Sequence, residues 1–253
     1  MKNARRAFLI QTALAGTAVA AGTAARRDGE LGAPERIIQG GVPWVEGTAD
    51  GPPATEGSGF KFFSAAEQAF IRAVVERLIP NDEVGPGAIE AGVPFFLDRQ
   101  LAGPFGRGDH FYLAGPWKKG APEQGYQSRF SPAELYRNAI KAIDAHCSRQ
   151  FGGRAFAALG ADELDALLKD LEAGKVELDD GVDGKSFFNM LLQNTKEGYF
   201  GDPIYGGNKD MGAWKMIGFP GAHYDYSDWI ARHGERVAIP PVSIKGRPGW
   251  RET

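Results

Sequence analysis

The chain has 253 residues, of which 43% are hydrophobic and 24% charged, and its formal net charge is −3. This composition predicts a globular protein of one domain, with enough apolar residues for a core. The negative charge argues against nucleic acid, or an anionic membrane surface, as the main partner. Cys147 is the only cysteine, so the chain alone can form no disulfide, cysteine-rich zinc site, iron–sulfur cluster or covalent haem c site.

Residues 1–25 are typical of a secretory signal peptide. The pair Arg5 and Arg6 precedes Phe8, Leu9 and an apolar run rich in Ala, Gly and Thr. This R-R-x-F-L core resembles a twin-arginine (Tat) signal, although two neighbouring positions depart from the usual pattern. The run is short and poor in Leu and Ile, which favours a cleaved signal over a retained anchor. Tat substrates cross the membrane folded, so we expect export of a folded protein to the periplasm, which suits a chain exported with a cofactor-loaded partner.

Residues 26–59 are rich in Gly, Pro, Glu and Thr and show little periodicity, which predicts an extended linker or arm. One part of this arm is too apolar for a pure spacer. Its apolar residues are Ile37, Ile38, Val42, Trp44 and Val45. We therefore expect this part to lie along a surface, and the surface of a partner is one option.

The first helices of the body have clear start signals. Ser64 and Glu67 form a capping box, which satisfies backbone donors at a helix start. Apolar residues then recur at helical spacing up to Ile79, and Pro80 marks the end. A second helix is expected to begin near Pro94, a favourable first-turn residue.

Residues 103–130 form a glycine-rich stretch that carries several aromatic residues, Trp117 among them. A helix is expected to resume at Ser131, with Glu134 as its capping-box acid, and its apolar side includes Cys147. Two outcomes stay open for this cysteine. It fits a small core residue, and an unpaired cysteine in an exported protein equally suggests a disulfide to a partner.

Two more helices are expected, one over residues 162–173 and one starting near Asp183. Alternating strand patterns are nearly absent. The sequence therefore predicts a mainly α fold, a small irregular helical domain over residues 60–226 with long Gly/Pro/aromatic loops. Residues 227–253 are expected to form an extended C-terminal tail, which gives the chain extended arms at both ends.

The stretch from Gly198 to Tyr226 alternates glycines with large aromatic residues. Its rings are those of Tyr199, Phe200, Tyr205, Trp214, Phe219, Tyr224 and Tyr226. So many glycines, together with two prolines, predict an ordered loop with at most one or two helical turns near Trp214. Two interpretations stay open, because the rings can pack on the body of the chain or face a partner. For a partner interface the candidate residues are Trp117, Cys147, Tyr205, Trp214, Phe219 and Tyr224.

The sequence carries no common motif for catalysis or for cofactor binding. The sequence has no G-x-G-x-x-G, P-loop, H-E-x-x-H or G-x-S-x-G motif, and its four histidines do not pair at metal-ligand spacing. Residues 179–190 imitate a calcium loop, but Gly181 and Met190 occupy ligand positions. Asp98 and Arg99 lie on an expected helix, where an ion pair or interface contact is favoured over acid–base chemistry. We therefore assign no catalytic, cofactor-binding or metal-binding residue to this chain.

Two long motifs nevertheless resemble a known family. DPIYGGNKDMGAWKMIGFPGAHYDY and, earlier in the chain, RLIPNDEVGPGAIEAGVPFFLDRQLAG are similar to the signature of gluconate 2-dehydrogenase subunit 3. The likeness covers most of residues 62–226. It implies the small, cofactor-free subunit of a membrane-associated sugar or sugar-acid dehydrogenase in the periplasm. It also implies a glucose–methanol–choline-type FAD subunit and a multihaem cytochrome c subunit as partners, with FAD and haem c bound there. Contact with the membrane would be indirect, through the complex.

Two rival hypotheses remain. The glycine-spaced aromatic residues also suit a stand-alone periplasmic carbohydrate-binding module, in which Trp214 or Tyr205 stacks on a sugar ring. The other rival is an enzyme with an unrecognised site. Binding of gluconate, glucose or fructose to the purified chain, measured by calorimetry, separates the first rival from the subunit hypothesis.

Overall fold

Helices make up the regular structure of the chain. The computed structural model describes residues 59–109, 111, 113, 115, 120–121, 124–223, 226–227, 230–234 and 240–244. Within these residues the elements are α2 (Ala65–Leu78), α3 (Val93–Ala102), α4 (Pro104–Arg107), α5 (Pro132–Gln150), η2 (Phe156–Ala158), α6 (Ala161–Glu172), α7 (Gly184–Phe200), η3 (Pro203–Tyr205), η4 (Lys209–Met211) and α8 (Gly212–Ile217). The described part contains no strand beyond two isolated bridges, so the predicted mainly α fold is confirmed.

The predicted helix starts are confirmed by their caps. Ser64 and Glu67 form the capping box of α2, and Ser131 and Glu134 form that of α5. The predicted helix near residue 183 is also present, because the Asp183 side chain accepts the backbone N–H of the second residue of α7. These local signals succeed because the capping bonds join residues only two or three positions apart.

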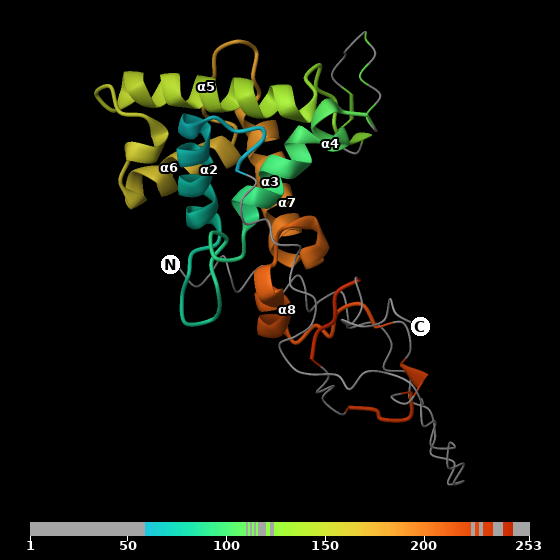
Figure 1. Ribbon diagram of the computed structural model, residues 1–253. Helices are drawn as coiled ribbons and strands as arrows, with labels where there is room; N and C mark the ends of the chain where they lie inside the picture. Colours follow the sequence, from blue (N-terminus) through green and yellow to red (C-terminus); the bar gives the residue numbers. More distant parts are fainter. Residues whose placement is uncertain are drawn as a thin grey trace.

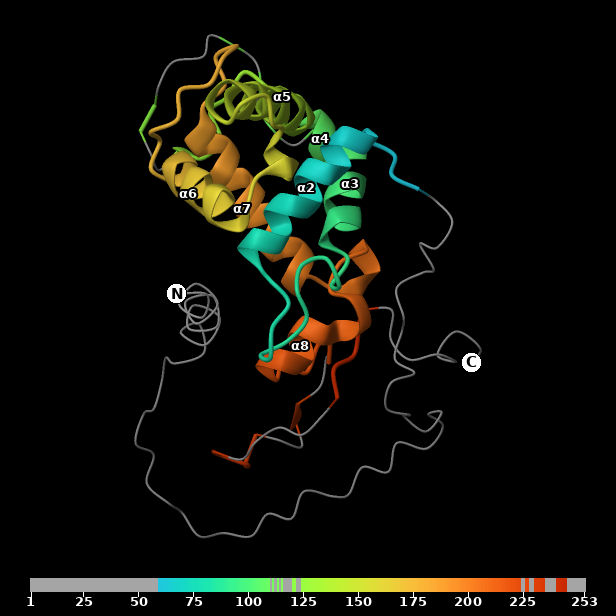
Figure 2. The same cartoon turned by 90° about the vertical axis from the view of Figure 1, so that its left-hand side faces the viewer.

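Helix α7 lies at the centre of the arrangement. It contacts α2, α3, α5, α6 and α8, and α5 lies across one end of the body with α8 near the other (Figures 1 and 2). Aromatic rings fill the space between the helices, with Phe70 4.3 Å from Phe156 and Tyr136 5.3 Å from Phe187 between ring centroids. The buried hydroxyl of Tyr136 accepts a hydrogen bond of 3.1 Å from Asn194, so this polar atom has a partner in the core.

Cys147 belongs to this core. The side chain on α5 is fully buried among apolar residues. Burial, and to a lesser degree the carboxylate of Asp144, raises the pKa of the Cys147 thiol to about 11. The geometry favours the core interpretation of this residue, because a disulfide to a partner requires the thiol to reach the surface as a thiolate.

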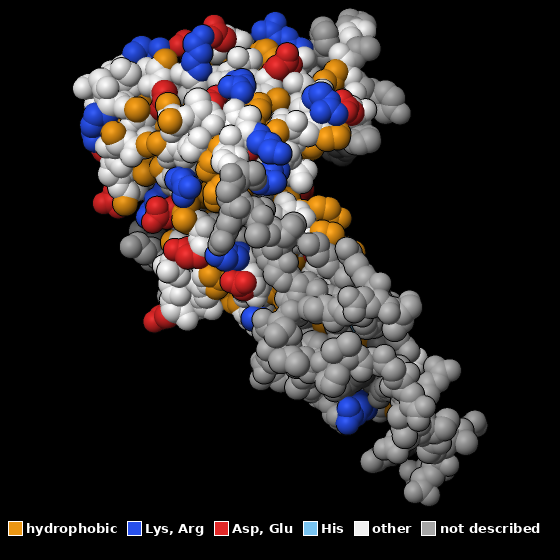
Figure 3. Space-filling model, viewed as in Figure 1, with side chains coloured by type: hydrophobic (Ala, Val, Ile, Leu, Met, Phe, Trp, Pro, Cys, Tyr) orange, Lys and Arg blue, Asp and Glu red, His pale blue; other side chains and the backbone are white. Residues whose placement is uncertain are grey.

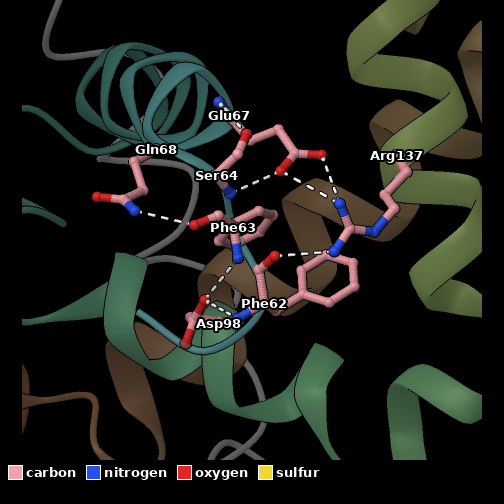
Figure 4. Close-up of polar contacts among 7 residues, drawn as sticks. All are labelled: Phe62, Phe63, Ser64, Glu67, Gln68, Asp98 and Arg137. Carbon is pink, nitrogen blue, oxygen red and sulfur yellow. Dashed lines mark hydrogen bonds and ion pairs between the residues drawn. The ribbon is translucent and has the colours of Figure 1, made fainter. Parts of the chain in front are cut away.

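A buried carboxylate anchors the short segment that precedes α2. Asp98 on α3 accepts three backbone N–H groups, from Lys61 at 2.7 Å, Phe62 at 2.8 Å and Phe63 at 2.9 Å (Figure 4). Arg137 on α5 holds the same segment from the other side. Its guanidinium donates to the carbonyl of Phe62 at 2.9 Å and lies 4.2 Å from the centre of the Phe62 ring. We call Asp98 and Arg137, with residues 61–63, the N-terminal clamp.

The structure differs from the sequence-based expectation in two places. The short helix α4 lies in the stretch 103–130, which was expected to be irregular. Helix α7 continues through Gly198 to Phe200, so the aromatic stretch begins inside a helix. Glycine is required at position 198 by packing, because a Cβ there would lie 2.6 Å from the ring of Phe96 on α3.

Several features of the sequence analysis lie outside the described residues. They are the signal residues Arg5, Arg6, Phe8 and Leu9, the arm up to residue 58, Trp117, Tyr224 and most of the tail beyond residue 227.

Candidate functional site

The stretch after α7 is ordered by its own short helices. Elements η3, η4 and α8 follow one another between residues 203 and 217. Left-handed backbone occurs at the start of η4 and within it, with φ of 44° at Asn208, 56° at Asp210 and 53° at Met211. Such conformations are costly for residues other than glycine, so the surrounding contacts must stabilise them.

Asn208 provides the most important of these contacts. It is fully buried, and its backbone N–H donates to the carbonyl of Gly198 at 2.9 Å. Its side chain donates to the carbonyl of Gly201 at 2.9 Å and accepts the N–H of Ala213 at 3.0 Å. The preceding Gly207 must lack a side chain, because a Cβ would collide with the backbone of Gly198. One amide side chain therefore joins the end of α7 to the start of α8.

A second polar residue, Asp202, ties the C-terminal tail to this loop. Its carboxylate is buried and caps η3 by accepting the N–H of Ile204 at 2.9 Å. It also accepts the hydroxyl of Ser243 at 2.8 Å and the N–H of Ile244 at 2.7 Å. Residues separated by about forty positions in the sequence are thus held at one carboxylate.

Trp214 packs inside the chain. Its side chain is 5% exposed, and the indole N–H donates to the carbonyl of Phe200 at 2.6 Å. The ring of Phe219 meets it edge-on, 5.1 Å between centroids. For Trp214, the geometry favours the interpretation that the ring packs on its own body. A role at the core of a partner interface stays a prediction for this residue.

Other apolar side chains of the same framework point to solvent. Tyr205 is 54% exposed, Phe219 is 45% exposed and Ile244 is 61% exposed. Each is tied to the loop core, because Tyr205 ends η3, Phe219 packs on Trp214 and Ile244 bonds to Asp202. We call Tyr205, Phe219 and Ile244 the loop surface. Sequence reasoning missed Ile244, since nothing in the tail sequence indicates that it returns to the loop.

The polar groups of this region serve structure. Asp202 and Asn208 form their hydrogen bonds with backbone groups and, in the case of Asp202, also with the hydroxyl of Ser243. The Nε2 atom of His223 lies 3.4 Å from the carbonyl oxygen of Pro240. The calcium-like stretch is used in the same way. Asp179 pairs with Arg149 at 2.8 Å, and the side chain of Asp183 caps α7. No group of three His, Cys, Asp or Glu residues that could hold a metal ion occurs among the residues that the structure describes.

The outer face of the helical body carries mixed charge. On the face in Figure 3, hydrophobic side chains are interspersed with Lys, Arg, Asp and Glu. None of the helices in the described part of the chain combines the length and apolar character needed to cross a membrane.

Comparison with known proteins identifies one family. The model of a family described as gluconate 2-dehydrogenase subunit 3 matches residues 65–221, from the first residue of α2 to Gly221, four residues after the end of α8. The match therefore covers more than half of the chain and includes both Asp202 and Asn208. No curated protein and no solved structure matches the chain.

Proposed function

Because the chain belongs to the gluconate 2-dehydrogenase subunit 3 family, we propose that it is the small, non-catalytic subunit of a flavin-dependent dehydrogenase complex. The complex oxidises a sugar or sugar acid in the periplasm. Its catalytic subunit is a flavoprotein of the glucose–methanol–choline type, and a multihaem cytochrome c subunit takes the electrons onward. FAD and haem c belong to those partners, and no residue of this chain enters the chemistry.

The observation that carries this proposal is the construction of the loop after α7. The polar side chains of Asn208 and Asp202 form hydrogen bonds within the chain. The side chains of Tyr205 and Phe219, in contrast, are exposed on a stable framework. Rigid aromatic side chains bury a large area on binding and lose little conformational entropy, which suits an interface with another protein. The family match runs over the same residues and supports another dehydrogenase subunit as the partner.

The export of the complex forms the second part of the proposal. A flavoprotein acquires FAD in the cytoplasm, and a folded protein cannot pass a translocon that threads unfolded chains. A tightly bound subunit with Arg5 and Arg6 in a Tat signal allows the assembled pair to cross together. This subunit then has two tasks, to stabilise the flavoprotein and to carry it out of the cytoplasm.

The test is association with a glucose–methanol–choline-type flavoprotein co-expressed with this chain. Tyr205→Ser, at an exposed hot-spot candidate, is expected to weaken association by about 2 kcal/mol, or roughly thirtyfold in Kd. The matched control is Lys141→Ala, an exposed side chain on α5, which should leave the Kd unchanged. Helix α5 lies across the end of the body away from α8 (Figure 1). Equal affinity for both variants would place the interface elsewhere. Saturable binding of gluconate, glucose or fructose to the purified chain would favour the carbohydrate-binding alternative.

A further inference from the structure

The tail segment 240–244 occupies a site of defined geometry. It lies outside the residues matched by the family, yet Val242 and Ser243 are buried. Val242 pairs with the loop as in a parallel sheet, because its N–H donates to the carbonyl of Pro220 at 3.2 Å and its carbonyl accepts the N–H of Ala222 at 2.6 Å. Backbone pairing of this kind is how an extended peptide adds to an exposed backbone edge.

Two further features make the site selective for backbone and hydroxyl groups. Asp202 accepts the hydroxyl of Ser243 and the N–H of Ile244 through its two carboxylate oxygens. Gly221 leaves room for the peptide, because a Cβ on it would collide with the carbonyl oxygen of Val242 and lie 2.6 Å from its nitrogen. The receptor is thus an edge of three residues, 220–222, with a buried carboxylate at its end.

The bound segment also changes what the loop presents to solvent. Asp202 caps η3, the helix of Tyr205, and the same carboxylate holds the N–H of Ile244. Ile244 is the most exposed of the three side chains of the loop surface, and it belongs to the tail segment itself. Gly221, on which the tail lies, packs against the ring of Trp214, with a Cβ position 3.0 Å from that ring.

We propose that residues 220–222 and Asp202 form a binding site for an extended peptide, and that residues 240–244, bound there, complete the loop surface that contacts the flavoprotein. The second half of this inference rests on the proposed function, whereas the peptide site does not. The tail is accordingly part of the recognition surface, although it lies beyond residues 65–221, which the family model matches.

The first experiment tests the peptide site without any partner. A specific protease sequence is inserted between Arg236 and Val237 of the full-length chain, which is cut after folding. A fluorescent peptide with the sequence of residues 238–246 is then exchanged into the cut protein and followed by anisotropy. We expect saturable binding to the cut protein and at least tenfold weaker binding to the uncut one. Equal binding to both, or equal binding of a scrambled peptide, would overturn the site.

Matched variants test the contacts themselves. A Ser243→Ala peptide loses the hydroxyl bond to a buried carboxylate, and we expect about tenfold weaker binding. In the receptor, Gly221→Ala should abolish binding, whereas Gly218→Ala should not. The two glycines have similar φ, 79° and 71°, but a Cβ at Gly218 meets open space. The comparison separates collision with the peptide from backbone strain, and equal loss in both variants would contradict the assignment.

The second experiment adds the flavoprotein. After the cut tail is removed, we expect at least tenfold weaker association, restored by the wild-type peptide but not by an Ile244→Ala peptide. If association does not depend on the tail, the proposal that the tail contributes to the contact with the flavoprotein is wrong. The proposed peptide site is not affected by that result. If the uncut chain does not bind the flavoprotein at all, the proposed function fails, and the anisotropy experiment still decides the peptide site.

Discussion

Replacing Asp98 by Asn is the sharpest test of how the body is held together. In the N-terminal clamp, one buried carboxylate accepts three successive backbone N–H groups, those of residues 61–63. A hydrogen bond to a charged group contributes about 1.5–3 kcal/mol, but bonds that share one acceptor are not additive. Asn keeps one oxygen acceptor and turns an N–H donor toward the remaining backbone donor. We therefore expect a loss of about 2–3 kcal/mol for Asp98→Asn and about 3–5 kcal/mol for Asp98→Ala.

The measurement is urea unfolding of the full-length chain, followed by far-UV circular dichroism. The midpoint should fall at an unchanged m-value, and the melting temperature should fall by about 2–4 °C for each kcal/mol lost. The control is Asp179→Asn, which removes the same charge from an exposed ion pair with Arg149. Exposed pairs contribute about 0–1 kcal/mol, so this variant should stay close to wild type. If the free energies of unfolding of Asp98→Asn and Asp179→Asn differ by less than about 0.5 kcal/mol, the proposed importance of the clamp is refuted.

Further predictions concern three other parts of the chain. Asn208→Ala should lower the free energy of unfolding, measured in urea, by about 2–4 kcal/mol. The variant removes the hydrogen-bond partner of the Gly201 carbonyl and of the Ala213 N–H, and it places alanine at positive φ. The Cys147 thiol should resist a disulfide reagent until the chain unfolds, and non-reducing electrophoresis of the native complex should show no Cys147-dependent heterodimer; such a band would support the disulfide instead. Because the pKa of this thiol is raised from 9.0 to about 11, its contribution to stability should be complete below pH 9 and lost as pH rises to about 11. The double variant Arg5→Lys, Arg6→Lys should leave both this chain and its flavoprotein in the cytoplasm, measured by fractionation and FAD-dependent dye reduction; periplasmic activity of the flavoprotein without this subunit would contradict the export proposal.

Local chemistry explains which parts of the fold were predictable. The capping boxes at Ser64 and Ser131 join residues three positions apart, so their signal is complete within one turn. Helix α4 could not be predicted in the same way. It has only four residues between glycines, and its neighbours α3 and α5, which it contacts, supply the stability that its sequence lacks.

The buried polar residues were unpredictable for a different reason. The three partners of Asp98 lie 35 to 37 positions away, and two partners of Asp202 lie 41 and 42 positions away. No sequence periodicity reports such pairs. The two aromatic residues Trp214 and Tyr205 look equivalent in the sequence, and only tertiary packing places the first inside and the second in solvent.

The close approach of Gly207 to Gly198 has a consequence for how such chains diverge. A side chain at Gly207 would collide with the backbone of Gly198, and a side chain at Gly198 would collide with the ring of Phe96. These two positions are constrained by the fold itself, whatever the chain binds. Tyr205 carries no such constraint, because more than half of its side chain faces solvent. Under the proposed function, a chain of this family that binds a different partner subunit is free to exchange the residue at 205 while it keeps both glycines, so a change of partner need not disturb the framework that presents this residue.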